Sequence, residues 1–135
     1  MEGEPLEIRA YEEPDRYVLV LTGELDLAGV SPFEAAAEQL IEMGARKLLV
    51  EITGVDFIDS SGVRAILSVK AACARRGVEF SMTHGSGQAE RLFELTRLVE
   101  RLPFRKSGRT RPRRPVELQP RSRTGRDEPG PQALA

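Results

Sequence analysis

The fold is decided by the stretch GVDFIDSSGVRAILSVKAACARRG, residues 54–77. It begins with an apolar, strand-like approach, and after Asp59-Ser60-Ser61-Gly62 its apolar residues follow helical spacing: Val63, Ile66, Leu67, Ala71 and Ala74. Aspartate and serine are favoured at helix starts because their side-chain oxygens accept unpaired N–H groups of the first turn. The stretch therefore predicts a strand that passes directly into a helix, which Gly77 ends.

Elements of both kinds flank this stretch. Strands are predicted at residues 6–13, 16–23, 46–53, 78–83 and, at the end, about 102–105; the first two form an antiparallel hairpin around Pro14-Asp15. Helices are predicted at 31–44, with Ser31 as N-cap and Pro32 in the first position, and at 87–102. Alternating strands and helices imply an α/β fold, with a small mixed β-sheet of four to five strands and helices packed against it.

The last 29 residues differ in composition from the rest. Residues 107–135 contain five of the nine prolines, and their seven arginines and three acidic residues leave a charge of +4. Residues 1–106, with 13 basic and 18 acidic residues, carry −5. A segment so poor in apolar residues cannot offset its ordering entropy. We therefore predict one domain over 1–106 and a disordered Pro/Arg-rich tail over 107–135.

Several classes of protein are disfavoured by composition. The single Cys73 excludes an intramolecular disulfide and fits a reducing compartment. The acidic amino terminus does not resemble a signal peptide, and no apolar run reaches the ~20 residues of a membrane helix. One histidine and one cysteine cannot form the usual zinc sites. We expect a cytoplasmic protein that has no membrane partner, no cofactor and no catalytic site.

The Asp59–Gly62 junction has two interpretations. It can serve only as a helix cap, as many such turns do. Alternatively, it lies at the carboxyl edge of a parallel strand, where open α/β sheets place their sites, and a serine hydroxyl there faces solvent at the positive end of a helix. Phosphorylation adds about −1.5 to −2 charges, which that helix end can receive. The second interpretation predicts a switch of the surface that leaves the fold intact.

A family resemblance favours the switch. The segments LTGELDLAGVSPFEAAAEQL, KLLVEITGVDFIDSSGVRAIL and AERLFELTRL resemble, in order, the STAS domain of bacterial anti-sigma-factor antagonists, over about residues 6–105. The resemblance implies that Ser60 is phosphorylated by an anti-sigma factor serine kinase. The resemblance further implies that the unphosphorylated form binds that kinase and frees the sigma factor, that phosphorylation of Ser60 ends the binding, and that a separate serine phosphatase restores it. It also implies a partner surface formed by Glu24, Asp26, Asp59, Ser61, Gly62 and Arg64.

The chain departs from this family pattern in two places. Thr96-Arg97-Leu98 stands where the family often has a glycine before the leucine, so the last helix is expected to run longer. The basic tail lies outside the domain pattern. It lacks aromatic residues for base stacking, so we expect no specific nucleic-acid partner, and a solubilising extension is the preferred interpretation.

Two other functions compete with the antagonist. A STAS subunit that binds the ATPase of a lipid-transport ABC system would use the same helix surface, although its serine turn is usually degenerate. An enzyme such as a phosphohydrolase built on Asp59 would need metal ligands and an acid–base partner, which the sequence does not offer.

Overall fold

The protein folds as one sheet with helices packed on it, and the computed structural model describes residues 4–98, 101–105 and 111–120. The strands are β1 (Glu7–Glu13), β2 (Arg16–Leu25), β3 (Lys47–Ile58), β4 (Glu79–Thr83), β5 (Phe104–Arg105) and β6 (Arg114–Val116). The helices are α1 (Leu27–Glu42), α2 (Ser60–Arg75) and α3 (Gly87–Leu95). The strand order is β5-β4-β3-β2-β1-β6.

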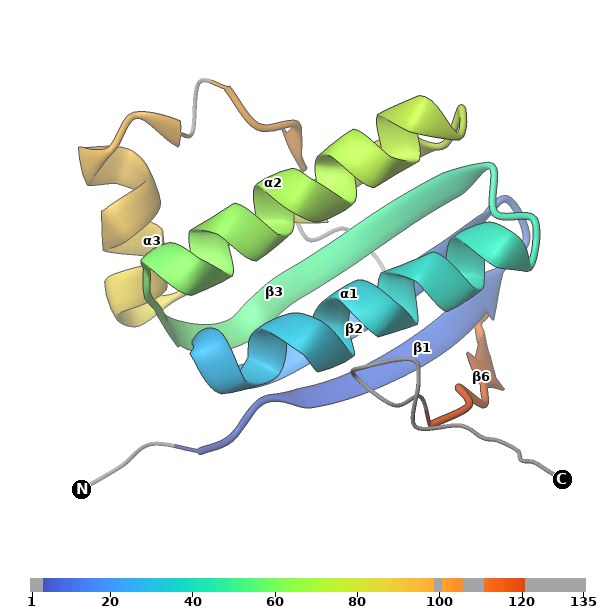
Figure 1. The fold of residues 1–135 in the computed structure, drawn as a ribbon, viewed down its shortest axis with the longest axis horizontal. Coiled ribbons are helices and arrows are strands. Elements are labelled where there is room, and N and C mark those ends of the chain that lie inside the picture. Colours follow the sequence, from blue (N-terminus) through green and yellow to red (C-terminus); the bar gives the residue numbers. More distant parts are fainter. Residues whose placement is uncertain (1–3, 99–100, 106–110, 121–135) are drawn as a thin grey trace, which may run out of the picture.

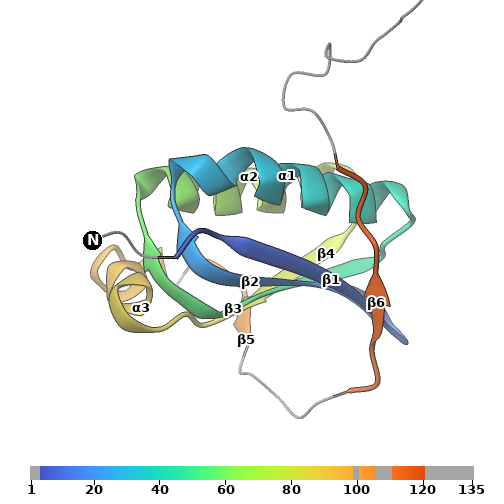
Figure 2. The ribbon, with the colours of Figure 1, turned by 90° about the horizontal axis from the view of Figure 1, so that it is seen from below.

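The predicted α/β fold is confirmed. β1 and β2 form the antiparallel hairpin, and β2, β3, β4 and β5 are parallel to one another. α1 and α2 lie side by side on one face of the sheet, and α3 lies at one end of it (Figure 1; Figure 2). Aliphatic strand residues and the inner faces of the helices form the core; Leu21, Phe33, Leu48, Ile66 and Phe93 are fully buried.

The first helix begins earlier than the sequence predicted. Its N-cap is Asp26, whose carboxylate accepts a hydrogen bond from the Ala28 N–H at 3.2 Å, and Pro32 lies inside the helix. The prediction of a start at Ser31 is therefore wrong. The additional turn is favoured because Gly29 packs directly against Leu6, the residue before β1. A Cβ on Gly29 would lie 2.8 Å from Leu6 Cδ2. This burial outweighs the backbone hydrogen bond that proline removes.

The last helix ends earlier than expected. α3 ends at Leu95. Arg97, which stands where the family pattern often has a glycine, adopts a left-handed φ of 61°. The Leu92 carbonyl accepts hydrogen bonds from both the Thr96 N–H, at 3.0 Å, and the Thr96 hydroxyl, at 2.7 Å, which fixes the last turn of the helix. Leu98 then packs against the core. Burial of this leucine favours the turn, although the turn costs about 1 kcal/mol or more for a residue with a side chain.

Residues 111–120, which we call the strap, correct the prediction of a tail that is disordered throughout. Within the strap, β6 pairs antiparallel with β1, with Arg114 opposite Glu12 and Val116 opposite Ala10. This pairing makes the sheet six-stranded instead of four- to five-stranded. The remainder of the predicted tail, 107–110 and 121–135, lies outside the described residues.

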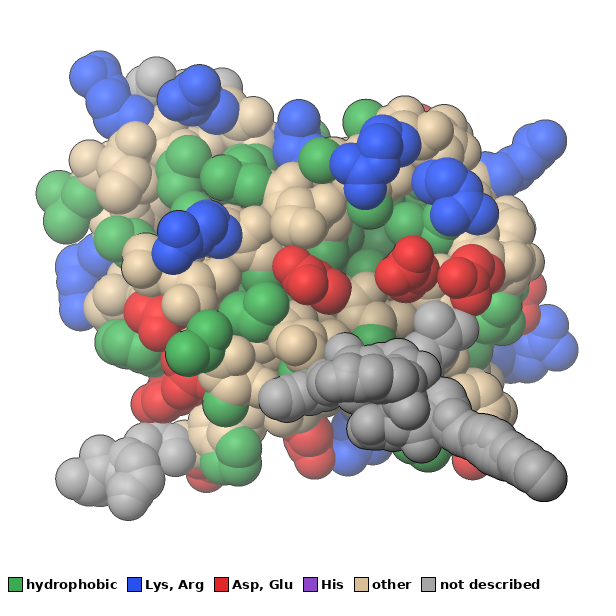
Figure 3. Space-filling model, in the orientation of Figure 1, with side chains coloured by type: hydrophobic (Ala, Val, Ile, Leu, Met, Phe, Trp, Pro, Cys, Tyr) green, Lys and Arg blue, Asp and Glu red, His purple; other side chains and the backbone are tan. Residues whose placement is uncertain are grey.

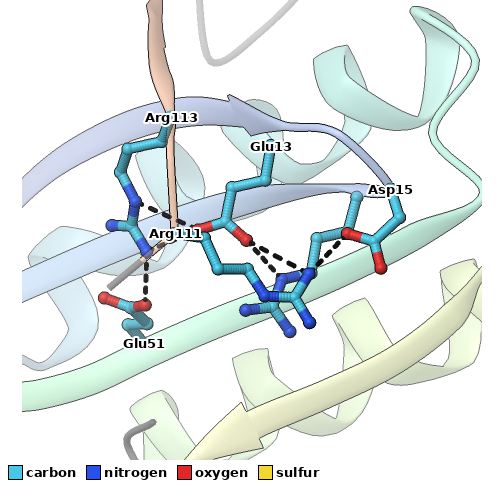
Figure 4. Close-up of polar contacts among 6 residues, drawn as sticks. Glu13, Asp15, Glu51, Arg111 and Arg113 are labelled. Atoms are coloured by element: carbon cyan, nitrogen blue, oxygen red, sulfur yellow. Dashed lines mark hydrogen bonds and ion pairs between the residues drawn. The ribbon is translucent and has the colours of Figure 1, made fainter. Parts of the chain in front are cut away.

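The strap is held by ion pairs that composition could not reveal. The Glu13 side chain is fully buried and accepts hydrogen bonds from Arg16 on one oxygen and Arg113 on the other, each at 2.7 Å. Arg113 also reaches Glu51 on β3 at 3.0 Å (Figure 4). Burial disfavours the charged guanidinium, but the bonds and attraction from Glu51 and Glu13 raise the pKa of Arg113. The arginine content of the strap is thus compensated by carboxylates of the domain.

We expect Arg113→Ala to lower the free energy of unfolding by about 2 kcal/mol, because it removes a major counter-charge of the buried Glu13 carboxylate. The matched control is Arg114→Ala, whose side chain is 79% exposed, so its pair with Glu12 should contribute less than about 1 kcal/mol. Urea unfolding followed by circular dichroism measures both. Equal losses in the two variants would contradict this account of the strap.

Candidate functional site

The site is formed where two parallel strands end side by side. In the register of β2 with β3, Leu25 is the partner of Ile58, and the Asp59 N–H donates to the Leu25 carbonyl at 3.4 Å. Asp26 and Asp59 therefore follow neighbouring strand ends, and each is the N-cap of a helix. The parallel register brings the Gly-Glu-Leu-Asp segment beside the Asp-Ser-Ser-Gly segment.

Asp59 caps α2 and leaves the next side chain free to face outward. Its carboxylate accepts a hydrogen bond from the Gly62 N–H at 3.0 Å. Ser60 is the first helical residue and is exposed, whereas Ser61 is half-buried. The cap is thus present, as the simpler interpretation of this junction predicted. It also holds the Ser60 hydroxyl at the positive end of a sixteen-residue helix.

Gly62 allows α2 to approach β2 closely. It is buried, and a Cβ at this position would collide with the Leu25 carbonyl oxygen and lie 2.6 Å from Ile58 Cγ1. Neither of these neighbours is the end of a flexible exposed chain. The glycine of the motif therefore serves packing: it sets how close the helix start, and with it Ser60, lies to the sheet edge.

An apolar groove of about 420 Å³ runs beside Ser60, between the start of α2 and α3. Its lining, which defines the groove, is Phe57, Ile58, Asp59, Ser60, Val63, Arg64, Gln88, Leu92, Thr96 and Leu98. Gln88 of α3 accepts a hydrogen bond from the Ile58 N–H at 2.9 Å and so ties one wall to the other. The α3 side of this site was not predicted from the sequence, because only the fold brings Ile58 and Gln88, thirty positions apart, together.

More apolar surface surrounds the groove. Leu27 beside Asp26 is 73% exposed, Leu95 at the end of α3 is 81% exposed, and Phe57 is 37% exposed. In Figure 3 apolar side chains gather on the left, over the starts of α1 and α2 and over α3. In the sequence, the apolar residues Phe57, two positions before Asp59, and Leu27, directly after Asp26, are the signals that could have indicated this surface.

The remaining predicted residues lie at the same edge in different environments. Arg64 is exposed and lines the groove. Glu24 and Asp26 are half-buried. The Glu24 N–H donates to the Glu4 carbonyl at 3.1 Å, and Gly23 before it has φ of +100°. The Gly-Glu-Leu-Asp segment is thus held by the chain before β1 as well as by its own cap.

The other side chains with potential chemical roles are those that could bind a metal, the thiol of Cys73 and the imidazole of His84. No group of three or more potential metal-ligating side chains occurs among the described residues. Cys73 is fully buried, and burial raises its pKa to about 11. His84 contacts Glu90 at 2.9 Å and stacks on Phe104. Of the helices in residues 4–98, none has the length and apolar character needed to cross a membrane.

Solved structures share this architecture. An anti-sigma factor antagonist from Mycobacterium paratuberculosis is 18% identical, with a TM-score of 0.66 over 77% of this chain and 87% of that one. SpoIIAA, an anti-sigma factor antagonist solved in its unphosphorylated form, is 21% identical, with a TM-score of 0.60 over 77% and 89%. The Bacillus cell fate determinant SpoIIAA in its phosphorylated form is 20% identical, with a TM-score of 0.55 over 77% and 92%. These likenesses show a common fold.

Sequence comparison assigns the family. No curated protein matches the chain. A family model described as "Mlab, STAS domain" matches residues 8–103, which include both capping segments and both walls of the groove. The match ends before the strap. The chain therefore belongs to the STAS-domain family.

Proposed function

We propose that the protein is an anti-sigma-factor antagonist whose unphosphorylated form binds an anti-sigma factor serine kinase and thereby frees a sigma factor. Phosphorylation of Ser60 ends this binding, and a serine phosphatase restores it. The observation that carries the proposal is the exposed Ser60 hydroxyl, at the start of α2 and on the rim of an apolar groove. The structural neighbours support it, since they include one such antagonist solved in both phosphorylated and unphosphorylated forms.

The site can accept a phosphate without unfolding. Ser60 is exposed, and the cap that starts α2 is made by Asp59, so a modified Ser60 leaves the cap in place. A phosphate adds about −1.5 to −2 charges. Backbone N–H groups of the first turn and the helix dipole favour negative charge there. The modification therefore changes the surface and not the fold.

A docked partner responds differently from the fold. Asp56 is exposed and Asp59 half-buried, so the phosphate would join two carboxylates beside the groove. A partner that covers the groove has to bury or repel this group of negative charges, at a cost that rises when water is excluded. Apolar Phe57 and Leu92 then supply contact area in the unmodified form only. Arg64, Glu24 and Asp26 are proposed to orient the partner from the rim.

Incubation with the cognate kinase and ATP should place phosphate on Ser60, and Ser60→Ala should abolish it, because this hydroxyl is the exposed one of the motif. Ser61→Ala is the matched control and should still be modified, since Ser61 is half-buried. Peptide mapping by mass spectrometry locates the phosphate. Full modification of the Ser60→Ala variant would overturn the assignment.

Ser60→Asp should weaken binding of the kinase by more than tenfold, about 1.4 kcal/mol, because it places a carboxylate beside the groove. Ser68→Asp is the control: Ser68 is an exposed serine two turns further along α2, and it lies outside the groove lining. Its affinity should stay within threefold of the unsubstituted chain. Calorimetric titration measures both, and unchanged affinity of Ser60→Asp would refute the charge mechanism.

A second candidate is a STAS subunit that binds the ATPase of a lipid-transport ABC system through the same groove. The family description, which names Mlab and not an antagonist, is the observation that favours it. The complete Asp59-Ser60-Ser61-Gly62 motif favours signalling. A pull-down with the unmodified and the Ser60→Asp chains distinguishes the two: a transporter ATPase retained by both forms supports the second candidate, and a kinase lost from Ser60→Asp supports the first.

A further inference from the structure

We propose that the edge of β1 and the adjoining side of α1 form a docking site for an extended basic segment, which the strap fills in its own chain and which the strap of a second copy can fill instead. The acceptor residues, Tyr11, Glu13, Gln39 and Glu51, lie within residues 8–103, whereas the strap lies beyond the family match. The domain therefore carries a binding surface for an element that its family pattern does not include.

The first contact is strand addition. β6 pairs antiparallel with β1, with Pro115 opposite Tyr11 between the Arg114–Glu12 and Val116–Ala10 pairs. Without β6, β1 would be an edge strand whose N–H and C=O groups are open to another chain. Backbone pairing of this kind accepts any extended segment, and side chains of the segment then give specificity.

The second contact selects a basic residue. The Arg113 guanidinium lies between Glu13 and Glu51 (Figure 4). It also lies 5.1 Å from the centre of the Tyr11 ring. Glu13 is fully buried and Glu51 comes from a different strand, so the two carboxylates and the ring form a cation site to which two strands of the domain contribute. An arginine suits such a site because its planar fork can serve two carboxylates at once.

The third contact reads the backbone of the segment. The Gln39 side chain donates to the Gln119 carbonyl and accepts from the Gln119 N–H, both at 2.8 Å. Gln39 is buried in α1, and both the NH2 group and the carbonyl oxygen of its side chain form hydrogen bonds with a residue 80 positions away. This two-way bond requires an extended peptide at that point and is indifferent to the side chain of residue 119.

Chain length makes exchange between copies a natural consequence. β5 and β6 are the opposite edges of the sheet, separated by five interstrand spacings or about 24 Å. The nine residue steps from Arg105 to Arg114 reach at most about 32 Å, so a connection of this length exceeds the required distance by only about 8 Å. Short connecting segments favour exchange of an element between two copies, because the strap can then make the same contacts without the constraint that its own chain imposes.

The test shortens the connection in the otherwise complete chain. Deleting residues 106–110 leaves four steps, which reach about 14 Å and cannot span the sheet. The deletion variant should have twice the unsubstituted mass by light scattering at about 100 μM, because the strap then docks only in a second copy. The matched control, insertion of five Gly/Ser residues after residue 108, should keep the unsubstituted mass.

Two further variants identify the contact that holds the pair. In the deletion background, Gln39→Ala with Glu51→Ala should return the mass to that of one chain, because both anchors of the strap are lost. A folded deletion variant that stays single, or a pair that survives the loss of both anchors, would overturn the proposal. Circular dichroism verifies the fold of each variant.

If the deletion variant does not fold, binding of a peptide with the sequence of the strap tests the docking site instead. In the complete chain, Val116→Asp with Leu118→Asp should release the strap, because both side chains pack against the core, and should leave a folded domain whose Glu13 site is empty. A fluorescent peptide of residues 111–120 should then bind this variant at least tenfold more tightly than the unsubstituted chain, whose own strap competes. Equal binding to both chains, or none to either, would overturn the docking site. This outcome is independent of Ser60 and therefore of the proposed function.

Discussion

The parallel pairing of β2 with β3 is the constraint on which the site depends. Because Leu25 and Ile58 are opposite each other, both strands end at one edge, and the two aspartates that follow them start neighbouring helices. A change of register by one residue would turn the apolar faces of the strands away from the helices. The same pairing therefore determines the core, the position of Ser60 and the place of the groove.

At this edge of the sheet, the hydrogen bond by which Asp59 caps α2 also holds Ser60 at the surface. Asp59 satisfies an N–H group of α2, and Gly62 lets that helix approach the Leu25 carbonyl. The helix start is thereby rigid, so a charge placed on Ser60 cannot be relieved by a local rearrangement of the cap. In the proposed function, a charge placed on Ser60 therefore acts on a partner and not on the fold.

The other end of the sheet follows a different principle. There a carboxylate, Glu13, is buried and stabilised by Arg16 and by Arg113 of the strap. A buried charge is costly alone and acceptable when paired, so this glutamate makes the strap part of the folded unit. The strap and the Ser60 edge use separate surfaces, so the proposed exchange of the strap leaves the proposed phosphorylation site uncovered.

What the sequence by itself determined was local: the strand–turn–helix at Asp59, the hairpin at residues 6–23 and the end of α2 at Gly77 depend on neighbours within a few positions. The register that places Asp26 beside Asp59, the left-handed turn at Arg97 and the fold of the strap were decided by tertiary structure. The physical reason is sequence separation: Arg113 meets Glu13 across 100 positions, and composition alone shows only an excess of arginine.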